Sequence, residues 1–169
     1  MADLQITEVA PGEPDAPFTF RAEDGELLFV YFGYTSCPDV CPLTLSDIRA
    51  ALAEIDPDDA ARISVAFVTV DPERDTAEVL VPYLSHFFDR IHALRTEDRS
   101  ELETVQDAFG ASSTITPKDD GTYDVSHTAI SYIVDSDGDV VVEWPYGVSS
   151  EAMAHDLQIL TDTLEEQTT

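Results

Sequence analysis

The feature that most constrains the fold is the strand-like apolar run Leu27–Gly33, which is followed four residues later by Cys37-Pro-Asp-Val-Cys41-Pro42. Each cysteine precedes a proline, and a residue before proline is pushed out of the α region. We therefore expect a tight turn from Cys37 to Cys41. Pro42 suits the first helical position, and apolar periodicity continues from it to about Ile55. Both thiols are thus expected at a helix N-terminus, beyond the carboxyl end of a strand.

Such a cysteine pair is typical of a redox site or a soft-metal site. The helix N-terminus favours the thiolate, whereas Asp39 between the cysteines opposes it, so the sequence does not fix the direction of the thiol pKa shift. A turn of this span brings the sulfurs close enough to share one metal ion at about 2.3 Å, or to close a disulfide. Soft thiolates select copper(I), zinc or iron–sulfur groups. A structural disulfide across so short a loop gains little stability, because the entropic benefit grows with loop length.

A third ligand must be sought elsewhere, because two cysteines do not fill a tetrahedral structural zinc site. The histidines of the chain are His86, His92, His127 and His155. His127 is the best candidate, since it ends a polar loop and enters a β-branched strand, as ligand-bearing loops commonly do. A hydrogen-bonded loop histidine is the alternative interpretation. His86 and His155 fit helix surfaces, and His92 fits the start of a strand.

Strands and helices alternate along the rest of the chain. The expected strands are a short one near Phe18–Phe20, then Leu27–Gly33, Ile63–Val70, His92–Leu94, Ala129–Val134 and Val140–Trp144. The expected helices are Pro42 to about Ile55, one after Asp71–Thr76 to about Phe88, Arg99–Phe109, and one after Ser149. Ala111–Asp120 is loop-like in composition, and Asp75 and Glu78 have the spacing of a capping box.

This order predicts a single α/β domain with a central mixed sheet flanked by helices. Paired cysteines after the first core strand make it resemble the thioredoxin fold. We expect residues 1–17 to be an N-terminal extension and residues 18–166 to form the thioredoxin-like domain. The acidic segment Asp135–Asp139 is read as a hairpin turn and not as a calcium loop, because its glycine comes too early.

The charge is extreme: 35 acidic and 8 basic residues give a formal net charge of -27. Nucleic acid and anionic membrane surfaces would be repelled, so we expect neither as a direct partner. The acidic residues are dispersed, which is typical of a salt-adapted, halophilic protein whose self-repulsion is screened at high ionic strength. An acidic face for a basic partner is the alternative.

Nothing in the sequence predicts membrane insertion. The chain has no run of 18 apolar residues, and its first residues do not resemble a signal peptide. Two locations are consistent with this: the cytoplasm if the chain is complete, or a soluble domain whose natural anchor lies outside this chain.

Three motifs together resemble the Sco/SenC family of copper-binding, thioredoxin-like proteins, which serve assembly of the dinuclear copper (CuA) centre of cytochrome c oxidase. They are Gly33-Tyr-Thr-Ser-Cys-Pro-Asp-Val-Cys-Pro42, Asp71-Pro-Glu-Arg-Asp-Thr76 and Tyr123-x-Val-x-His127. The motifs occur in the family's order and approximate spacing, and the resemblance runs from about Phe18 to the C-terminal helix.

The resemblance implies that Cys37, Cys41 and His127 bind one copper ion per chain, as copper(I) or copper(II). It also implies that Cys37 and Cys41 are a redox-active dithiol, because copper needs both thiols reduced. The implied partner is the copper-bearing subunit of cytochrome c oxidase or another copper or thiol protein. We expect a monomer, held at the extracytoplasmic face of the cell membrane by an anchor outside this chain.

One position departs from the family pattern. The family usually has an aspartate just before the ligand histidine, where this chain has Ser126; Asp124, two residues earlier, is the candidate substitute. Arg74 and Asp75 should face the cysteines from the carboxyl edge of the sheet. We interpret them as a turn and a helix cap, or as residues that support the site or dock a partner.

Enzyme functions remain as alternatives, and the chain is more typical of a copper chaperone than of a turnover enzyme. A metal-independent thiol-disulfide oxidoreductase of thioredoxin-like type would have no use for His127, and the cysteine spacing departs from the usual Cys-x-x-Cys. A cysteine peroxidase would have threonine three residues before its nucleophile, whereas Thr35 lies two before Cys37. A copper sensor without a delivery role is a third possibility.

Overall fold

Strand and helix segments alternate over residues 27–108, as the sequence predicts. The computed structural model describes residues 3–167. Its elements, in chain order, are β1 (Gln5–Glu8), β2 (Ala16–Thr19), β3 (Leu27–Gly33), α1 (Val40–Glu54), α2 (Pro57–Ala60), β4 (Ile63–Thr69), α3 (Ala77–Leu84), β5 (Ile91–Leu94), α4 (Arg99–Ala108), β6 (Ser113–Pro117), β7 (Tyr123–His127), β8 (Ile130–Val134), β9 (Val140–Pro145) and α5 (Ser150–Gln167).

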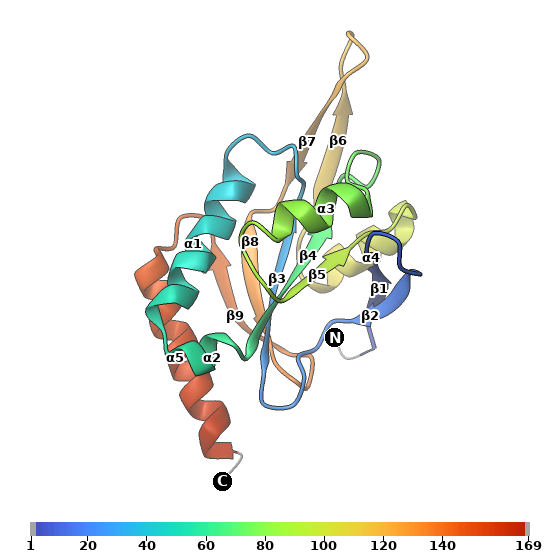
Figure 1. The fold of residues 1–169 in the computed structure, drawn as a ribbon. Coiled ribbons are helices and arrows are strands. Elements are labelled where there is room, and N and C mark those ends of the chain that lie inside the picture. Colours follow the sequence, from blue (N-terminus) through green and yellow to red (C-terminus); the bar gives the residue numbers. More distant parts are fainter. Residues whose placement is uncertain (1–2, 168–169) are drawn as a thin grey trace.

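A mixed sheet organises the molecule. Within residues 3–167 it has seven strands in the order β2-β1-β5-β4-β3-β8-β9, and β6 and β7 form a separate hairpin. β3 runs parallel to β4, and β4 parallel to β5, whereas β8, β9, β1 and β2 join in antiparallel fashion. The expected thioredoxin-like architecture, a central mixed sheet flanked by helices, is confirmed (Figure 1).

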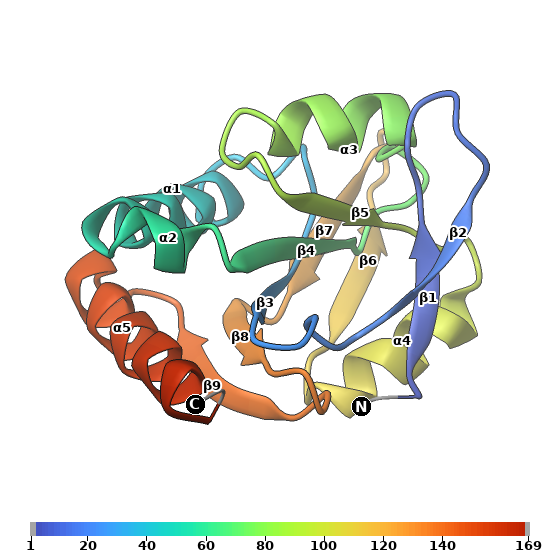
Figure 2. The same cartoon turned by 60° about the horizontal axis from the view of Figure 1, so that its bottom comes forward.

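Helices cover both faces of the sheet, which explains why β3 and β4 are buried at every residue. Along β3, Phe29 and Tyr31 point into a core shared with α1, α3 and α5. Val30 and Phe32 alternate to the other face and pack in a second core with α4. Figure 2 shows α1 and α5 on one side of the sheet and α4 on the other. This packing holds the carboxyl end of β3 rigid where the cysteine segment leaves it.

The N-terminal segment belongs to the sheet. β1 pairs with β2 along its whole length and meets β5 at the pair Glu8 and Leu94. Ile6 is almost fully buried in the core that contains α4. Residues 1–2 lie outside the described part of the chain, but the remainder of the expected 1–17 extension supplies β1 and half of β2. The sheet therefore has no break at residues 17 and 18.

The helix after the cysteines begins earlier than predicted. α1 starts at Val40, so Cys41 lies in its first turn and not in the preceding loop. The restriction before proline is a preference, and here the hydrogen bond from the Leu43 N–H to the Asp39 carbonyl, 3.2 Å, overrides it. Pro42 still costs nothing, because N–H groups of the first turn have no intrahelical partner. The expected position of both thiols at a helix N-terminus is confirmed.

The hairpin of β6 and β7 also departs from the prediction, because Ser113–Pro117 lies in the segment read as loop. β6 is at most half-buried, so it lacks the apolar alternation that marks a strand in sequence. Its pairing with β7, from Ser113 opposite His127 to Pro117 opposite Tyr123, creates the strand. Figure 1 shows this hairpin projecting from one end of the sheet.

Two smaller differences concern helices. The short α2, with Pro57 at its start, was not predicted. The capping box on Asp75 is wrong: Thr76 is the residue that precedes α3, and Asp75 is buried. Across residues 3–167, no helix combines the length and the apolar character needed to cross a membrane.

Candidate metal centre

The two cysteines lie just beyond the carboxyl end of β3. The chain turns after Gly33, and the Cys37 N–H donates to the Tyr34 carbonyl at 3.3 Å. Cys41 follows in the first turn of α1, where its backbone N–H donates to Cys37 Sγ at 3.3 Å. Both residues are free thiols. The turn therefore faces the two sulfurs toward each other, as the sequence predicts.

Gly33 is what allows this close approach. A Cβ atom at this position would lie 2.9 Å from the rings of Tyr31 and Phe67 and 3.1 Å from Cys41 Sγ. The missing side chain leaves the space that the Cys41 thiol occupies. Cys41 is completely buried, whereas Cys37 is half-buried. The site therefore has one covered thiol and one thiol that solvent and partners can reach.

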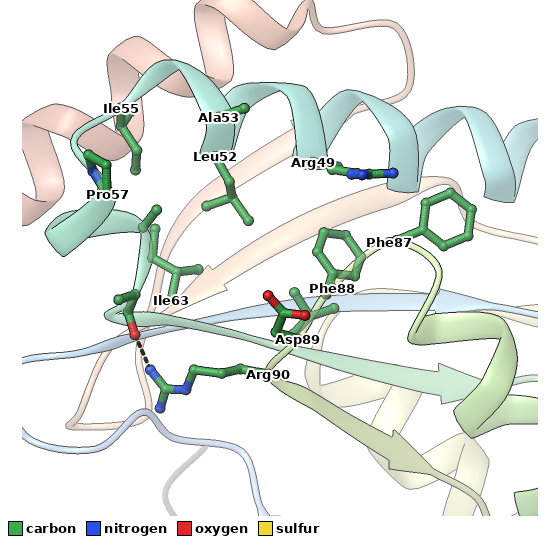
Figure 3. A pocket seen from close by; sticks show the side chains of 13 residues that line it. Arg49, Leu52, Ala53, Ile55, Pro57, Ile63, Phe87, Phe88, Asp89 and Arg90 are labelled. Carbon is green, nitrogen blue, oxygen red and sulfur yellow. Dashed lines mark hydrogen bonds between the residues drawn. The ribbon is translucent and has the colours of Figure 1, made fainter.

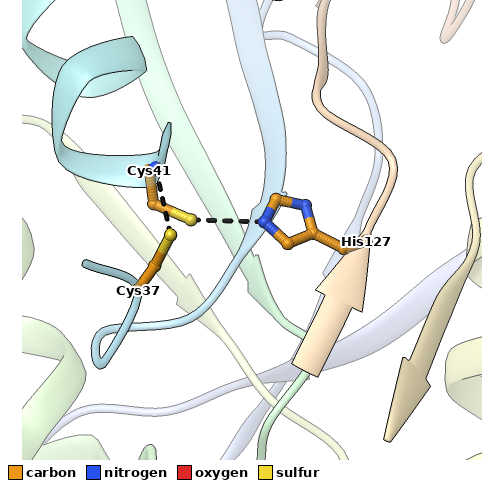
Figure 4. A group of neighbouring side chains, drawn as sticks. All are labelled: Cys37, Cys41 and His127. Atoms are coloured by element: carbon orange, nitrogen blue, oxygen red, sulfur yellow. Dashed lines mark hydrogen bonds between the residues drawn. The ribbon is translucent and has the colours of Figure 1, made fainter. Parts of the chain in front are cut away.

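His127 brings the third donor atom from the end of β7. Its Nε2 lies 3.3 Å from Cys41 Sγ, and Figure 4 shows the ring directed at the sulfur. Its Nδ1 lies 3.0 Å from the Thr128 carbonyl oxygen, which can only accept, so Nδ1 carries the proton. Burial lowers the pKa of His127, which keeps the ring neutral at pH 7. Nε2 therefore presents its lone pair toward the thiols, as a metal ligand must.

The three donor atoms converge to within 4.8 Å of one another. Two donors that share one ion lie at most about 4.6 Å apart, twice a metal–sulfur distance of about 2.3 Å. The arrangement is thus close to that of a three-ligand site. Two thiolates and an imidazole suit a soft or borderline ion such as copper(I) or zinc. Among the predicted site residues, the structure brings together Cys37, Cys41 and His127.

A hollow of about 330 Å³ opens over the half-buried thiol. Its walls come from the cysteine turn and from the strand that carries His127. They are formed by Tyr34, Cys37, Pro38, Asp39, Val40, Val125, Ser126, His127 and Ala129. Cys41 is absent from this lining, so an incoming ion or thiol meets Cys37 and His127 first.

The buried thiol is held protonated in the apo state. Burial raises the pKa of Cys41 to about 12, although a hydrogen bond with the backbone of Tyr34 lowers it. At neutral pH the S–H of Cys41 therefore donates to the lone pair on His127 Nε2. A metal ion must displace this proton to use the sulfur, so binding releases a proton and depends on pH.

Buried Asp75 fixes the segment that leads to Cys37. Its carboxylate accepts hydrogen bonds from the Thr35 N–H at 3.1 Å, the Thr35 hydroxyl at 2.6 Å and the Thr69 hydroxyl at 2.6 Å. Asp75 and Thr69 are almost completely buried. The sequence interpretation of Asp75 as a helix cap missed this role. The supporting role named as an alternative is the one that the contacts show.

Asp71 and Arg74 lie beside the strand that carries His127. Asp71 is fully buried and accepts hydrogen bonds from Arg74 Nε and, at 2.8 Å, from the Tyr123 hydroxyl. The guanidinium of Arg74 lies 4.3 Å from the centre of the Tyr123 ring. Sequence reasoning placed Arg74 at this edge but missed Asp71, Tyr34 and Tyr123 as supports. Their only signal in the sequence was membership of the three motifs: Tyr34 and Tyr123 share a motif with a ligand, and Asp71 shares one with Arg74.

The candidate substitute for the missing aspartate is not at the site. Asp124 and Ser126 point to the exposed face of β7, opposite to His127, because side chains alternate along a strand. The Asp124 carboxylate pairs with Lys118 Nζ at 2.6 Å. The hypothesis that Asp124 stands in near the copper ligands is therefore wrong.

The other histidines lie away from the cysteines. His86 and His155 are exposed. His92 Nδ1 lies 2.8 Å from a carboxylate oxygen of Glu8, on β1. Among the described residues, the group of three or more thiol, imidazole or carboxylate side chains close enough to share an ion is the one at Cys37, Cys41 and His127.

A larger pocket, of about 500 Å³, lies near the opposite end of β3 and β4 (Figure 3). Its lining is mainly apolar, with Leu52, Phe87 and Phe88 among the side chains, and Arg90 donates to the carbonyl of Ala61 at its rim. The lining contains no thiol and no imidazole. The chemistry of the chain is therefore concentrated at the smaller hollow.

Known proteins resemble this chain over most of its length. The family model SCO1/SenC matches residues 13–162. The human mitochondrial protein SCO1 homolog is 38% identical over 121 residues, which cover 68% of this chain and 38% of the human protein. The chain spans about half the length of the curated relatives it matches.

Solved structures of Sco proteins also resemble this chain. The solution structure of apo Sco1 from Thermus thermophilus has a TM-score of 0.77 and 28% identity, with 93% of this chain and 90% of that chain covered. The structure of Bradyrhizobium japonicum ScoI with copper bound has a TM-score of 0.74 and 31% identity, with 92% and 96% covered. Fold, motif positions and family match coincide over most of the sequence. The chain belongs to the SCO1/SenC family.

Proposed function

We propose that this chain is a copper-binding metallochaperone and thiol redox protein that assists assembly of the CuA centre of cytochrome c oxidase. The observation that carries the proposal is the convergence of Cys37 Sγ, Cys41 Sγ and His127 Nε2 to within 4.8 Å. A relative with 31% identity, the ScoI protein of Bradyrhizobium japonicum, has been solved with copper bound. The resemblance of the sequence to the Sco/SenC family supplies the link to oxidase assembly.

The donor set suits an ion that must be held and then released. Thiolates stabilise copper(I), and the imidazole makes copper(II) acceptable as well, so one site accepts the ion in either state. Three ligands leave a coordination position free for a ligand of the partner. We propose one copper ion per chain, bound only when both cysteines are reduced.

The partner in this proposal is the copper-bearing subunit of cytochrome c oxidase or another copper or thiol protein. The hollow beside Cys37 supports the proposal, because it leaves one sulfur and the imidazole accessible while Cys41 stays covered. A partner thiolate that enters the hollow can replace the ligands one at a time. The family resemblance alone supports a location at the extracytoplasmic face of the cell membrane.

The decisive experiment is an anaerobic copper titration of the reduced protein, with free thiols counted before and after. We expect one copper per chain, and a thiolate-to-copper(II) charge-transfer absorption with a matching electron paramagnetic resonance spectrum. His127→Ala should abolish that copper(II) spectrum, because it removes the imidazole. The matched control is His155→Ala, which removes an exposed imidazole of α5. Failure of the wild-type protein to bind stoichiometric copper would contradict the proposal.

One observation favours a second function, that of a metal-independent thiol-disulfide oxidoreductase. Cys37 is half-buried beside an open hollow, and Cys41 is buried behind it with its N–H directed at Cys37 Sγ. In this alternative Cys37 attacks a partner disulfide and forms a mixed disulfide, and one partner thiol leaves. Cys41 then attacks Cys37, releases the second partner thiol and leaves a Cys37–Cys41 disulfide. Rapid exchange with a disulfide substrate, equal in wild type and His127→Ala and without copper binding, would favour it.

A further inference from the structure

The strand that carries His127 belongs to a hairpin that needs support from the rest of the molecule. Within residues 3–167, β6 pairs with β7 outside the main sheet. A two-stranded hairpin is marginally stable by itself in water, so contacts with the body must fix its direction. Tyr123, Val125 and His127 form the half-buried face of β7, and Asp124 and Ser126 form the exposed face. The half-buried face therefore decides where His127 lies.

The end of the hairpin near His127 is fixed by its neighbours. The Ser113 hydroxyl of β6 donates to Gln106 Oε1 of α4 at 3.3 Å. Arg99 Nη2, at the start of α4, donates to the Ser113 carbonyl at 3.0 Å. These contacts hold one end only, and the strands continue four residues further toward the turn. Without a second attachment the hairpin would pivot about this end.

The second attachment is formed at Tyr123, the first residue of β7. Its hydroxyl donates to Asp71 Oδ1 at 2.8 Å, and the same carboxylate accepts from Arg74 Nε. Asp71 is fully buried, so its carboxylate oxygens are shielded from water. Burial and the hydrogen bond to Asp71 raise the pKa of Tyr123 to about 12, which keeps the hydroxyl a donor. The start of β7 is thus tied to the loop after β4.

Arg74 also connects this attachment to the cysteine side of the site. Its guanidinium carbon lies 4.3 Å from the centre of the Tyr123 ring and 6.0 Å from that of Tyr34. Tyr34 precedes the cysteine turn, and its hydroxyl donates to the Val125 carbonyl at 3.3 Å. The Tyr34 ring also meets the His127 ring edge to face at 5.8 Å. A single cation therefore lies between an aromatic ring from each half of the site.

We propose that Tyr34, Asp71, Arg74 and Tyr123 form a clamp, the Arg74 clamp, that positions the β6–β7 hairpin and thereby holds His127 over the two thiols. These are positioning residues, because none of them supplies a donor atom to the ion. The consequence for copper rests on the proposed function, whereas the effect on the hairpin is a property of the metal-free protein. The clamp should matter most for copper(II), because the imidazole is the ligand that makes this state acceptable.

The test uses graded changes at Tyr123. Tyr123→Phe removes the hydrogen bond to Asp71 and keeps the ring beneath Arg74, whereas Tyr123→Ala removes both. Arg74→Lys keeps the charge and loses the planar guanidinium. The control is Asp124→Asn, which breaks the ion pair with Lys118 on the same hairpin but on its exposed face. If the clamp exists, Tyr123→Ala should have the largest effect and Tyr123→Phe a smaller one. Asp124→Asn should behave like wild type.

Two readouts separate the clamp from the copper proposal. The first is amide hydrogen exchange of β7 in the reduced, metal-free protein, which should become roughly tenfold faster in Tyr123→Phe through loss of one hydrogen bond to a charged group. The second is copper binding: copper(II) affinity should fall about tenfold or more, with a changed charge-transfer spectrum. Copper(I) affinity should change much less, since both thiolates remain.

The outcomes are distinguishable. Equal β7 exchange in wild type, Tyr123→Phe and Tyr123→Ala would overturn the clamp, whatever the copper result. Faster β7 exchange with an unchanged copper(II) spectrum would contradict the claim that the clamp positions His127 for copper. If the wild-type protein bound no copper, the proposed function would fail, and the exchange measurement would still decide whether the clamp holds the hairpin. Arg74→Lys should reproduce the Tyr123→Phe result, and its equality with wild type would exclude Arg74 from the clamp.

Discussion

Removal of the Asp75 carboxylate gives the sharpest test of how the cysteine segment is held. The carboxylate accepts three hydrogen bonds, two from Thr35 and one from Thr69, and it is completely buried. Asp75→Ala removes the acceptor of all three bonds and leaves one N–H and two O–H donors without an acceptor. Asp75→Asn keeps the side-chain volume and one oxygen, so the two bonds now made to Oδ2 can persist as neutral hydrogen bonds.

The magnitudes follow from these counts. Each buried donor left unsatisfied costs on the order of 1–3 kcal/mol. Because such costs are not fully additive within one network, Asp75→Ala should lower the free energy of unfolding by about 3–5 kcal/mol. Asp75→Asn should cost about 1–2 kcal/mol. Glu73→Gln, the control in the same turn, changes an exposed side chain and should stay within about 0.5 kcal/mol of wild type.

Urea unfolding of the reduced, metal-free protein measures these differences. The fluorescence of Trp144, the single tryptophan, reports global unfolding, since it lies buried on β9 and contacts Asp156 of α5. The alkylation rate of Cys37 gives a second, local readout, and it should rise in Asp75→Ala because the segment from Thr35 is released. A loss below about 1 kcal/mol in Asp75→Ala, with unchanged Cys37 reactivity, would refute the reasoning.

The site and the composition give four further predictions. Gly33→Ala should lower the free energy of unfolding by about 1–3 kcal/mol and weaken copper binding, because the new Cβ would lie 2.9 Å from buried rings and 3.1 Å from Cys41 Sγ. Urea unfolding measures the change in stability, and copper titration measures the change in affinity. Iodoacetamide at pH 8 should modify Cys37 alone, since burial raises the pKa of Cys41 from 9.0 to about 12, and modification of both thiols in the native protein would contradict this. Above pH 9 the unfolded Cys41 thiol ionises, whereas the folded thiol keeps its proton. The contribution of Cys41 to stability is therefore complete below pH 9 and is lost as the pH rises toward 12. Cys41→Ala should weaken this pH dependence of the unfolding free energy. The melting temperature should rise between low and molar salt, because the net charge of -27 repels itself, and an equal melting temperature would exclude salt adaptation.

Local patterns in the sequence predicted most of the main sheet. The apolar runs of β3 and β4, the helix after Pro42 and the hairpin of β8 and β9 carry periodicities or turn residues that are legible within about ten residues. β6 was missed because both of its faces are largely exposed and its partner strand defines it. The start of α1 was missed because a preference before proline was overridden by a hydrogen bond with Asp39.

The sequence by itself determined the donor chemistry: a thiol pair with a spacing of four, and His127 as the best third ligand, at the end of a polar loop that enters a strand. Only the tertiary structure decided which groups meet. Cys41 and His127 are 86 positions apart, Tyr123 and Asp71 are 52 apart, and Thr35 and Asp75 are 40 apart. The same structure turned Asp124 away from the site and buried Asp75 within it. Hydrophobic periodicity indicates which face of a helix or strand is buried. It does not indicate which distant element covers that face, because the order of strands in the sheet and the packing of the helices set those contacts.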